Sequence, residues 1–312
     1  MRGIPARLKD AEMDWVLLSL VSAVAFTVVT LVQKRTLDSH VRSVVAFNAS
    51  AAVLQVSVAL VIIILAPPDD WFTSAVAIMV IVGVLQAAVW FLQSYAISRE
   101  TDISRIVPVL DSFPLLVLLI AVVFLGESLT PLKWIAMFLV TGGAILASWH
   151  QAKPGEPVRL NRSFFAIVGA VIAMSLMAVL FKVASASLSV GQMLALAWLC
   201  AAPVHFAVMR LTHEGVENVV AVFRSRTAFS WVGLTQLGML IAISSALMAL
   251  TLGPVSLSTA IMSTRPVLLM LWAVASGISL KHVITAGANR GPIRLRMASA
   301  SLVSLGVGAM AF

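Results

Sequence analysis

The chain has 312 residues, of which 61% are hydrophobic and 11% are charged. A soluble globular protein carries about 25% charged residues, so this composition excludes a fold that faces water on all sides. The net charge of +8 does not indicate nucleic-acid binding, because the basic residues lie between apolar segments, as they do in the cytoplasmic loops of membrane proteins.

Apolar segments long enough to cross a bilayer follow one another along the chain. Each crossing needs about 20 residues as a helix, and a helix is expected because lipid offers no partner to the backbone groups of an isolated strand. The predicted spans are 14–33, 43–66, 72–97, 103–125, 131–149, 163–186, 190–211, 228–251, 256–279 and 293–312. The sequence therefore predicts an all-α membrane protein with ten transmembrane helices.

Several boundaries carry residues that stop or start helices. Pro67 and Pro68 end the second span, and Thr130-Pro131 places an N-cap residue and a proline at the start of the fifth. Ala23-Val24-Ala25 is similar to a signal-peptidase site, but the apolar segment continues to Val32. We therefore expect an uncleaved first span.

The two halves of the chain are similar to each other in sequence. Segments of the first half align, in the same order, with segments of the second, and Lys34 falls on Lys182. The aligned segments are Ser22–Arg35 with Ala170–Val183, Tyr95-Ala96-Ile97 with Met248-Ala249-Leu250, and Asp111–Val122 with Ser263–Val274. With five spans each, an odd number, the halves must enter the membrane in opposite senses, as in many secondary transporters with a midplane site. We expect two inverted five-helix repeats, 14–149 and 163–312, joined by a polar linker at 150–162.

One segment resembles a known transporter module. Arg105–Leu146 (RIVPVLDSFPLLVLLIAVVFLGESLTPLKWIAMFLVTGGAIL) is similar to the fourth and fifth helices of an EamA module of the drug/metabolite transporter (DMT) superfamily, including its Gly126-Glu127 and Gly142-Gly143 pairs. The likeness runs from about Trp15 to Phe312, although Ser279-Leu280-Lys281 replaces Gly-Glu in the second half. It implies a ten-helix transporter, usually an exporter of amino acids, other metabolites or drugs, driven by an ion gradient or by the gradient of the substrate.

Charged residues at mid-depth in a membrane mark functional sites by default. Asp111 is the acidic residue nearest mid-depth and Arg265 the nearest basic one, and the repeat places them on equivalent helices. A buried, unpaired charge costs several kcal/mol, so an Asp111–Arg265 pair across a central cleft is expected. Either the pair locks the halves together, or it binds substrate or a proton, with Asp111 as the proton-coupling group.

Polar residues on the third span suggest a water-filled cleft. Gln86, Trp90 and Gln93 have the spacing i, i+4, i+7, which places them on one helix face. We expect this face to bind a polar or zwitterionic substrate, although hydrogen bonding between helices would also use it. Weaker candidates for the same cleft are Asn48, Gln55, Gln236, Ser244 and Ser245.

Other polar residues have a structural interpretation. Lys34 and Lys182 are expected to extend to the membrane interface, and Glu127 to stabilise the start of the fifth helix. His205 has no second ligand at metal spacing, which favours a packed histidine over a metal site. Glycines such as Gly142 permit close approach of helices, within one chain or in a homodimer.

Function is therefore predicted as secondary transport of small polar metabolites, such as amino acids, or of drugs, by alternating access. No motif for ATP hydrolysis, metalloprotease or serine hydrolase chemistry is present, so neither an enzyme nor a cofactor is expected. Two alternatives remain, a flippase for a lipid-linked substrate and a membrane scaffold or sensor without transport. The partners expected are a small molecule and the bilayer of the cell (plasma or inner) membrane.

The two arguments on orientation disagree. Basic residues gather in the loops opposite the N-terminal side, so the positive-inside rule places both termini outside. The resemblance implies termini in the cytoplasm.

Overall fold

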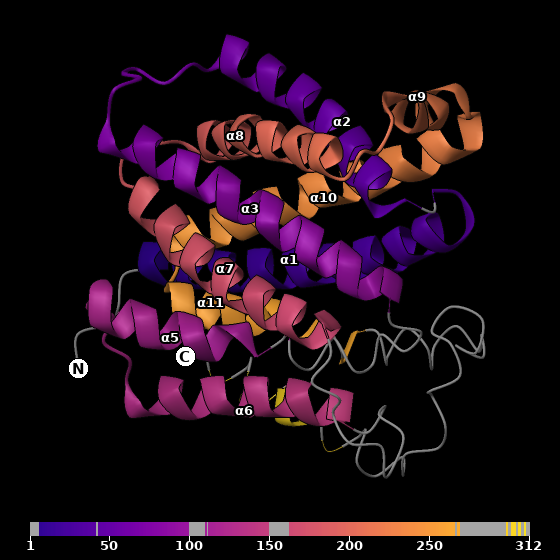
Figure 1. Ribbon diagram of the computed structural model, residues 1–312. Helices are drawn as coiled ribbons and strands as arrows, with labels where there is room; N and C mark the ends of the chain where they lie inside the picture. Colours follow the sequence, from indigo (N-terminus) through magenta and orange to yellow (C-terminus); the bar gives the residue numbers. More distant parts are fainter. Residues whose placement is uncertain are drawn as a thin grey trace.

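The computed structural model describes residues 6–41, 43–99, 110, 112–149, 162–265, 267–268, 298, 301–303, 305–306 and 309. Within these residues the chain is helical and has no strand (Figure 1). The helices are α1 (Ala6–Ser39), α2 (Val44–Leu65), α3 (Ser74–Arg99), α5 (Phe113–Phe124), α6 (Pro131–Trp149), α7 (Arg162–Ala184), α8 (Val190–Leu211), α9 (Val216–Arg224), α10 (Arg226–Leu252) and α11 (Val255–Met262).

Six helices of the described chain are long and apolar enough to cross a membrane. These stretches are Asp14–Ser39, Val44–Leu65, Ser74–Ala96, Phe165–Ala184, Val190–Leu211 and Arg226–Leu252. Large apolar side chains such as Ile64, Leu119 and Val123 are exposed on the outside of the bundle. A soluble monomer rarely exposes extended apolar patches, whereas a bilayer covers them with lipid. In the part that the structure describes, the chain is an all-helical membrane protein.

Local sequence signals set several helix ends where they were predicted. The Ser43 hydroxyl accepts the N–H of Ala46 at the start of α2, and Leu65 ends that helix before Pro67. At the start of α6, the Thr130 hydroxyl accepts the N–H of Lys133. Such caps satisfy backbone donors that have no partner inside the helix.

Helices α1, α3, α7 and α10 form the centre of the molecule. Helix α1 packs along α10, and α3 packs along α7 and α8, while α2 packs along α8 (Figure 1). The short α11 contacts both α1 and α5. The largest apolar core includes Met79, Met193, Trp198 and Met239, all almost fully buried. Helices α1, α3, α7 and α10 thus surround the space between the two halves of the chain.

Helix α1 is longer than the first predicted span, which ended at residue 33. It continues to Ser39, and polar residues there have partners on a neighbouring helix or within α1 itself. The Gln33 amide donates to Ser94, and the Lys34 ammonium lies 2.9 Å from the Asp38 carboxylate. The sequence analysis also missed α9, a short helix that buries Val219 and Val222.

The ninth predicted span, 256–279, is interrupted in the structure. Helix α11 begins after Pro254 and ends at Met262, and a turn at Ser263 and Thr264 separates it from Arg265. Residues 269–297 lie outside the described residues. A break here leaves backbone groups near mid-depth, which a membrane tolerates only where protein or a cavity covers them.

Candidate binding site

A hollow of about 110 Å³ lies among α1, α3, α5, α7, α10 and α11, and we call it the central chamber. By this measure one water molecule needs roughly 10–15 Å³, so the chamber has room for several waters or a small organic molecule. From α1 and α3 it is lined by Phe26, Val29, Thr30, Gln33, Gln86, Val89, Trp90 and Gln93. From α7 and α10 it is lined by Met174, Met177, Ala178, Phe181, Met239, Ile243, Ala246, Leu247 and Leu250. Phe113, Thr259, Met262 and Arg265 complete the lining.

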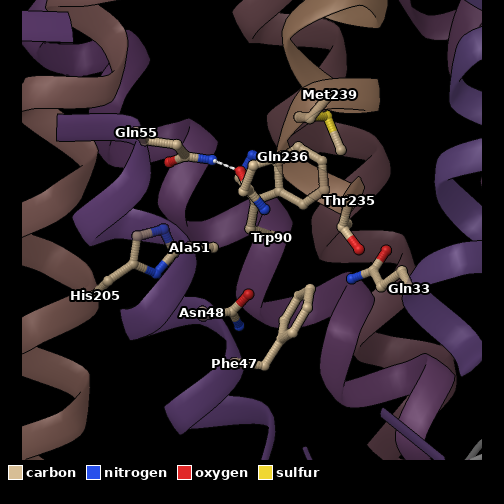
Figure 2. Close-up of a pocket in the computed structure, with 10 residues that line it drawn as sticks. All are labelled: Gln33, Phe47, Asn48, Ala51, Gln55, Trp90, His205, Thr235, Gln236 and Met239. Carbon is tan, nitrogen blue, oxygen red and sulfur yellow. Dashed lines mark hydrogen bonds between the residues drawn. The ribbon is translucent and has the colours of Figure 1, made fainter. Parts of the chain in front are cut away.

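A smaller hollow of about 10 Å³ lies beside the chamber, and we call it the side pocket (Figure 2). Gln33, Trp90 and Met239 line both hollows, so the two share a wall. The other side-pocket residues are Phe47, Asn48, Ala51, Gln55, His205, Thr235 and Gln236. The side pocket has room for about one water or a small polar group.

Side-chain amides are connected by hydrogen bonds around the side pocket. Gln33 Nε2 donates to Ser94 Oγ at 3.0 Å, and Ser94 Oγ donates to Asn48 Oδ1 at 3.4 Å. Across the pocket Gln55 Nε2 donates to Gln236 Oε1 at 2.9 Å (Figure 2). These bonds tie α1, α2, α3 and α10 together at the edge of the chamber.

Three buried polar atoms at the two hollows have no hydrogen-bond partner among the described residues. They are Gln33 Oε1, Asn48 Nδ2 and Gln86 Oε1. An unsatisfied buried polar group costs about 1–3 kcal/mol, and native proteins keep few of them. A polar ligand or water in the hollows would satisfy these atoms.

Most of the residues predicted to bind substrate line the central chamber. Gln86 and Gln93 are buried, Trp90 is half-buried, and all three face the chamber from α3. Arg265 faces it from the other half, with its guanidinium carbon 5.8 Å from the centre of the Phe26 ring, within the range of a cation–π contact. Asp111 lies outside the described residues, so its pairing with Arg265 and its role in proton coupling stay predictions.

The weaker candidates divide between the two hollows and the packed interior. Asn48, Gln55 and Gln236 line the side pocket. Ser245 is buried but is not among the residues that line either hollow. The chamber thus receives predicted polar residues from α3 together with Arg265, while α2 and α10 supply those of the side pocket.

Sequence analysis missed several polar residues of the hollows, among them Gln33 and His205. Gln33 was assigned to the end of the first span, and His205 was interpreted as a packed histidine, yet both line the side pocket. A signal for Gln33 was present, because Phe26, Thr30 and Gln33 have the same i, i+4, i+7 spacing as Gln86, Trp90 and Gln93. That spacing is typical of one helix face.

Glu127 has a partner other than the one expected. Its carboxylate accepts the N–H of Val255 at 2.7 Å and that of Ser256 at 3.4 Å, and the Ser256 hydroxyl donates to it at 2.6 Å. The carboxylate therefore caps α11, and its assignment to the start of the fifth helix was wrong. An anion at a helix N-terminus is favoured by the unpaired N–H groups and by the helix dipole.

Lys182 also stays inside the bundle instead of extending to the interface, as the sequence had suggested. Its ammonium donates to the carbonyl oxygens of Leu250 at 2.7 Å, Thr251 at 3.2 Å and Gly253 at 3.0 Å. These carbonyls end α10, where a cation is favourable. Lys182 and Glu127 thus stabilise the two sides of the break between α10 and α11.

Comparison with known proteins agrees with this architecture. The fold is similar to that of a protein of known crystal structure, with a TM-score of 0.69 and 16% sequence identity. The superposition covers 95% of this chain and 95% of the other chain. At that identity the likeness concerns the fold alone. A search of curated proteins gives no match.

The amino-terminal part of the chain matches a family of membrane transporters. Residues 13–149 match the model of the EamA-like transporter family. This family consists of transporters and not of enzymes. Residues 13–149 of this multi-pass membrane protein are therefore similar to an EamA-like transporter domain of the drug/metabolite transporter superfamily.

Proposed function

We propose that the chain is a secondary transporter that moves small molecules through the central chamber by alternating access. Its ten helices form two inverted repeats, 14–149 and 163–312, joined by the linker 150–162. It works as an exporter of metabolites such as amino acids, or of drugs, in the cell membrane. The EamA-like domain supports the transporter class.

The packing of the helices supports the repeat. Exchanging the two halves replaces α1 by α7, α2 by α8 and α3 by α10. The contact of α1 with α10 then becomes the contact of α7 with α3, and the contact of α2 with α8 maps onto itself. Two inverted repeats produce this pattern of contacts.

The lining of the chamber carries the proposal. On each of the four central helices, lining residues have the spacing i, i+4, i+7, and the alignment of the halves superimposes them. The sets are Phe26, Thr30 and Gln33 on α1, Met174, Ala178 and Phe181 on α7, Gln86, Trp90 and Gln93 on α3, and Met239, Ile243 and Ala246 on α10. A hollow that both halves line at equivalent positions is suited to open alternately to either side.

Gln86, Trp90, Gln93 and Arg265 are the proposed substrate-binding residues. Arg265 lies just after the turn that ends α11, so a movement of this broken helix would move its charge relative to the chamber. Moving one elementary charge through the membrane potential is worth about 2.3 kcal/mol per 100 mV. Asp111, as a protonatable carboxylate, is the proposed proton-coupling group.

Flux through reconstituted vesicles tests this function. Proteoliposomes are preloaded with tritiated amino acids, cationic drugs or uncharged amphipathic amides, and efflux is measured with the wild type, Arg265→Ala and Asp111→Asn. We expect the wild type to move at least one compound, and each variant to lower that flux at least tenfold because it removes a charge from the transport pathway.

Arg210→Ala is the matched control, since Arg210 is an exposed arginine at the end of α8, away from both hollows. It should keep wild-type flux. Full flux in both Arg265→Ala and Asp111→Asn would contradict the site, and a wild type that moves none of the compounds would contradict transport.

A further inference from the structure

The two halves line the chamber with different chemistry at equivalent positions. Where the first half has Gln33 and Gln86, the second has Phe181 and Met239. The further aligned pairs are Thr30 with Ala178 and Gln93 with Ala246. The chamber therefore has an amide wall, made by Gln33, Gln86 and Gln93 on α1 and α3, and an apolar wall, made by α7 and α10.

The amides of Gln33, on the amide wall, and of Asn48, in the side pocket, leave one donor and one acceptor unpaired, whichever way their hydrogen bonds run. As described, Gln33 donates to Ser94 and Ser94 to Asn48, which leaves the Gln33 oxygen and the Asn48 amino group unpaired. With both amides flipped, the chain of bonds reverses, and the unpaired atoms become the Gln33 amino group and the Asn48 oxygen. One donor and one acceptor remain in either case.

The apolar wall is wide and adaptable. It consists of methionine, phenylalanine and aliphatic side chains, including Met174, Met177, Phe181 and Leu247. Methionine is flexible and polarisable, and such surfaces adjust to different apolar shapes. No acidic side chain is among the described residues that line either hollow, so the lining offers no described counter-ion to a cationic group.

We propose that the chamber selects uncharged amphipathic molecules that carry an apolar body and one carboxamide-like group. The body packs on the apolar wall, and the carboxamide pairs with the amides of Gln33 and Gln86 on the amide wall. This assignment rests on the proposed transport function and narrows its substrate class. Arg265, the charged side chain among the described lining residues, already lies over the Phe26 ring. Small zwitterions such as free polar amino acids fit the apolar wall poorly, because a charged group packed against that wall has no partner there.

A series of compounds that share an apolar phenylalkyl group and differ in their polar group tests the assignment. The affinity of the full chain in lipid nanodiscs is measured at pH 7 for tritiated 4-phenylbutyramide, 4-phenylbutyrate and 4-phenylbutylammonium. Binding to empty nanodiscs is subtracted. Acetamide, a carboxamide without the apolar group, is measured for comparison. We expect the amide to bind at least tenfold more tightly than either ion and at least 100-fold more tightly than acetamide.

Variants of the amide wall identify the residues that determine selectivity for the carboxamide group. Gln33→Met and Gln86→Met each give the first half the apolar character of the second, and each should weaken binding of the amide at least tenfold while binding of the carboxylate stays unchanged. Retained carboxylate binding shows that the chamber is still folded, and Gln93→Met provides a third variant of the same wall. Ser50→Ala is the control, because the buried Ser50 hydroxyl on α2 also has no partner among the described residues but lines neither hollow.

Three results of the binding experiments would overturn the assignment. They are tighter binding of either ion than of the amide, unchanged preference for the carboxamide group in all the glutamine variants, and no binding of the amide at millimolar concentration. Efflux of a zwitterionic amino acid that Trp90→Ala abolishes would also overturn it, yet would leave the transport function standing. A protein that moves no solute would instead contradict the transport function itself.

Discussion

Polar side chains in the membrane-spanning helices are the residues on which the function of this protein depends. Each costs free energy in hydrocarbon unless it is paired or faces a cavity, and this cost allowed the sequence to single out Gln86, Gln93 and Arg265. The same argument cannot name a partner. Glu127 and Lys182 were assigned to a helix start and to the membrane interface, but their partners lie on α10 and α11, far away in sequence.

Glu127→Gln tests the cap of α11. The amide keeps the shape of the carboxylate but loses its charge and one acceptor oxygen, so at least one of the three hydrogen bonds to Val255 and Ser256 cannot persist unchanged. Hydrogen bonds to charged groups contribute about 1.5–3 kcal/mol, and we expect a loss of about 1–2 kcal/mol. This loss of stability is measured as a lower midpoint of thermal unfolding in detergent, monitored by size-exclusion chromatography.

Glu217→Gln is the control for that substitution. Glu217 is also an acid in the first turn of a helix, but it is exposed on α9, so its replacement should change the midpoint little. Equal midpoints for Glu127→Gln and the wild type would show that the cap contributes nothing to stability.

At the scale of helices, close approach of α3 and α8 determines how the bundle packs. Gly83 on α3 lies against Ala197 and Cys200 on α8, and an added Cβ would stand 2.9 Å from the Ala197 carbonyl oxygen and would also meet the Cys200 Cβ. Small residues at such contacts are typical of membrane helices, because packing replaces the hydrophobic effect as the driving force.

Gly83→Ala should therefore separate α3 from α8. The obstructing atoms belong to backbone and Cβ, which cannot rotate away, and overpacking of this kind costs about 1–3 kcal/mol. We expect a lower thermal midpoint, and weaker binding of any chamber ligand because α3 carries Gln86 and Trp90.

Gly233→Ala is the matched control, because the same substitution there should not lower the thermal midpoint. An added Cβ at Gly233 in α10 meets nothing within 4 Å, and alanine is favoured over glycine inside a helix by about 0.5–1 kcal/mol. Its midpoint should be equal to or above that of the wild type. A Gly83→Ala protein that matches Gly233→Ala would contradict the described packing of α3 on α8.

At the scale of the whole molecule, the orientation in the membrane follows from which end of the bundle carries the basic loops. The turn at 185–189 precedes α8 and α9 follows it, so these two segments lie at opposite ends of a membrane-crossing helix. The end of α1 lies beside α10 at the α9 end, where His40 stacks on Trp231 at 5.4 Å. Arg210, Arg224 and Arg226 gather at this end, which the positive-inside rule assigns to the cytoplasm.

Cysteine labelling tests this orientation. Cys200 is the single cysteine, so Cys200→Ala gives a background without thiols, into which Ser187→Cys or Glu217→Cys is introduced at an exposed position. We expect a membrane-impermeant maleimide to label Ser187→Cys in intact cells, and Glu217→Cys only in inverted vesicles. The reverse pattern would place the start of α1 in the cytoplasm and would refute the charge argument.

The sequence by itself determined the membrane class, most crossing helices and the polar face of α3, because hydrocarbon thickness and the cost of buried polarity act on local composition. It also carried the similarity to EamA modules. Only the tertiary structure decided that Gln33 joins Gln86 at one chamber, that Lys182 and Glu127 stabilise the break after α10, and that α11 is short and broken. These features depend on contacts between residues distant in the chain, and any apolar helix of similar composition would satisfy the local pattern equally well.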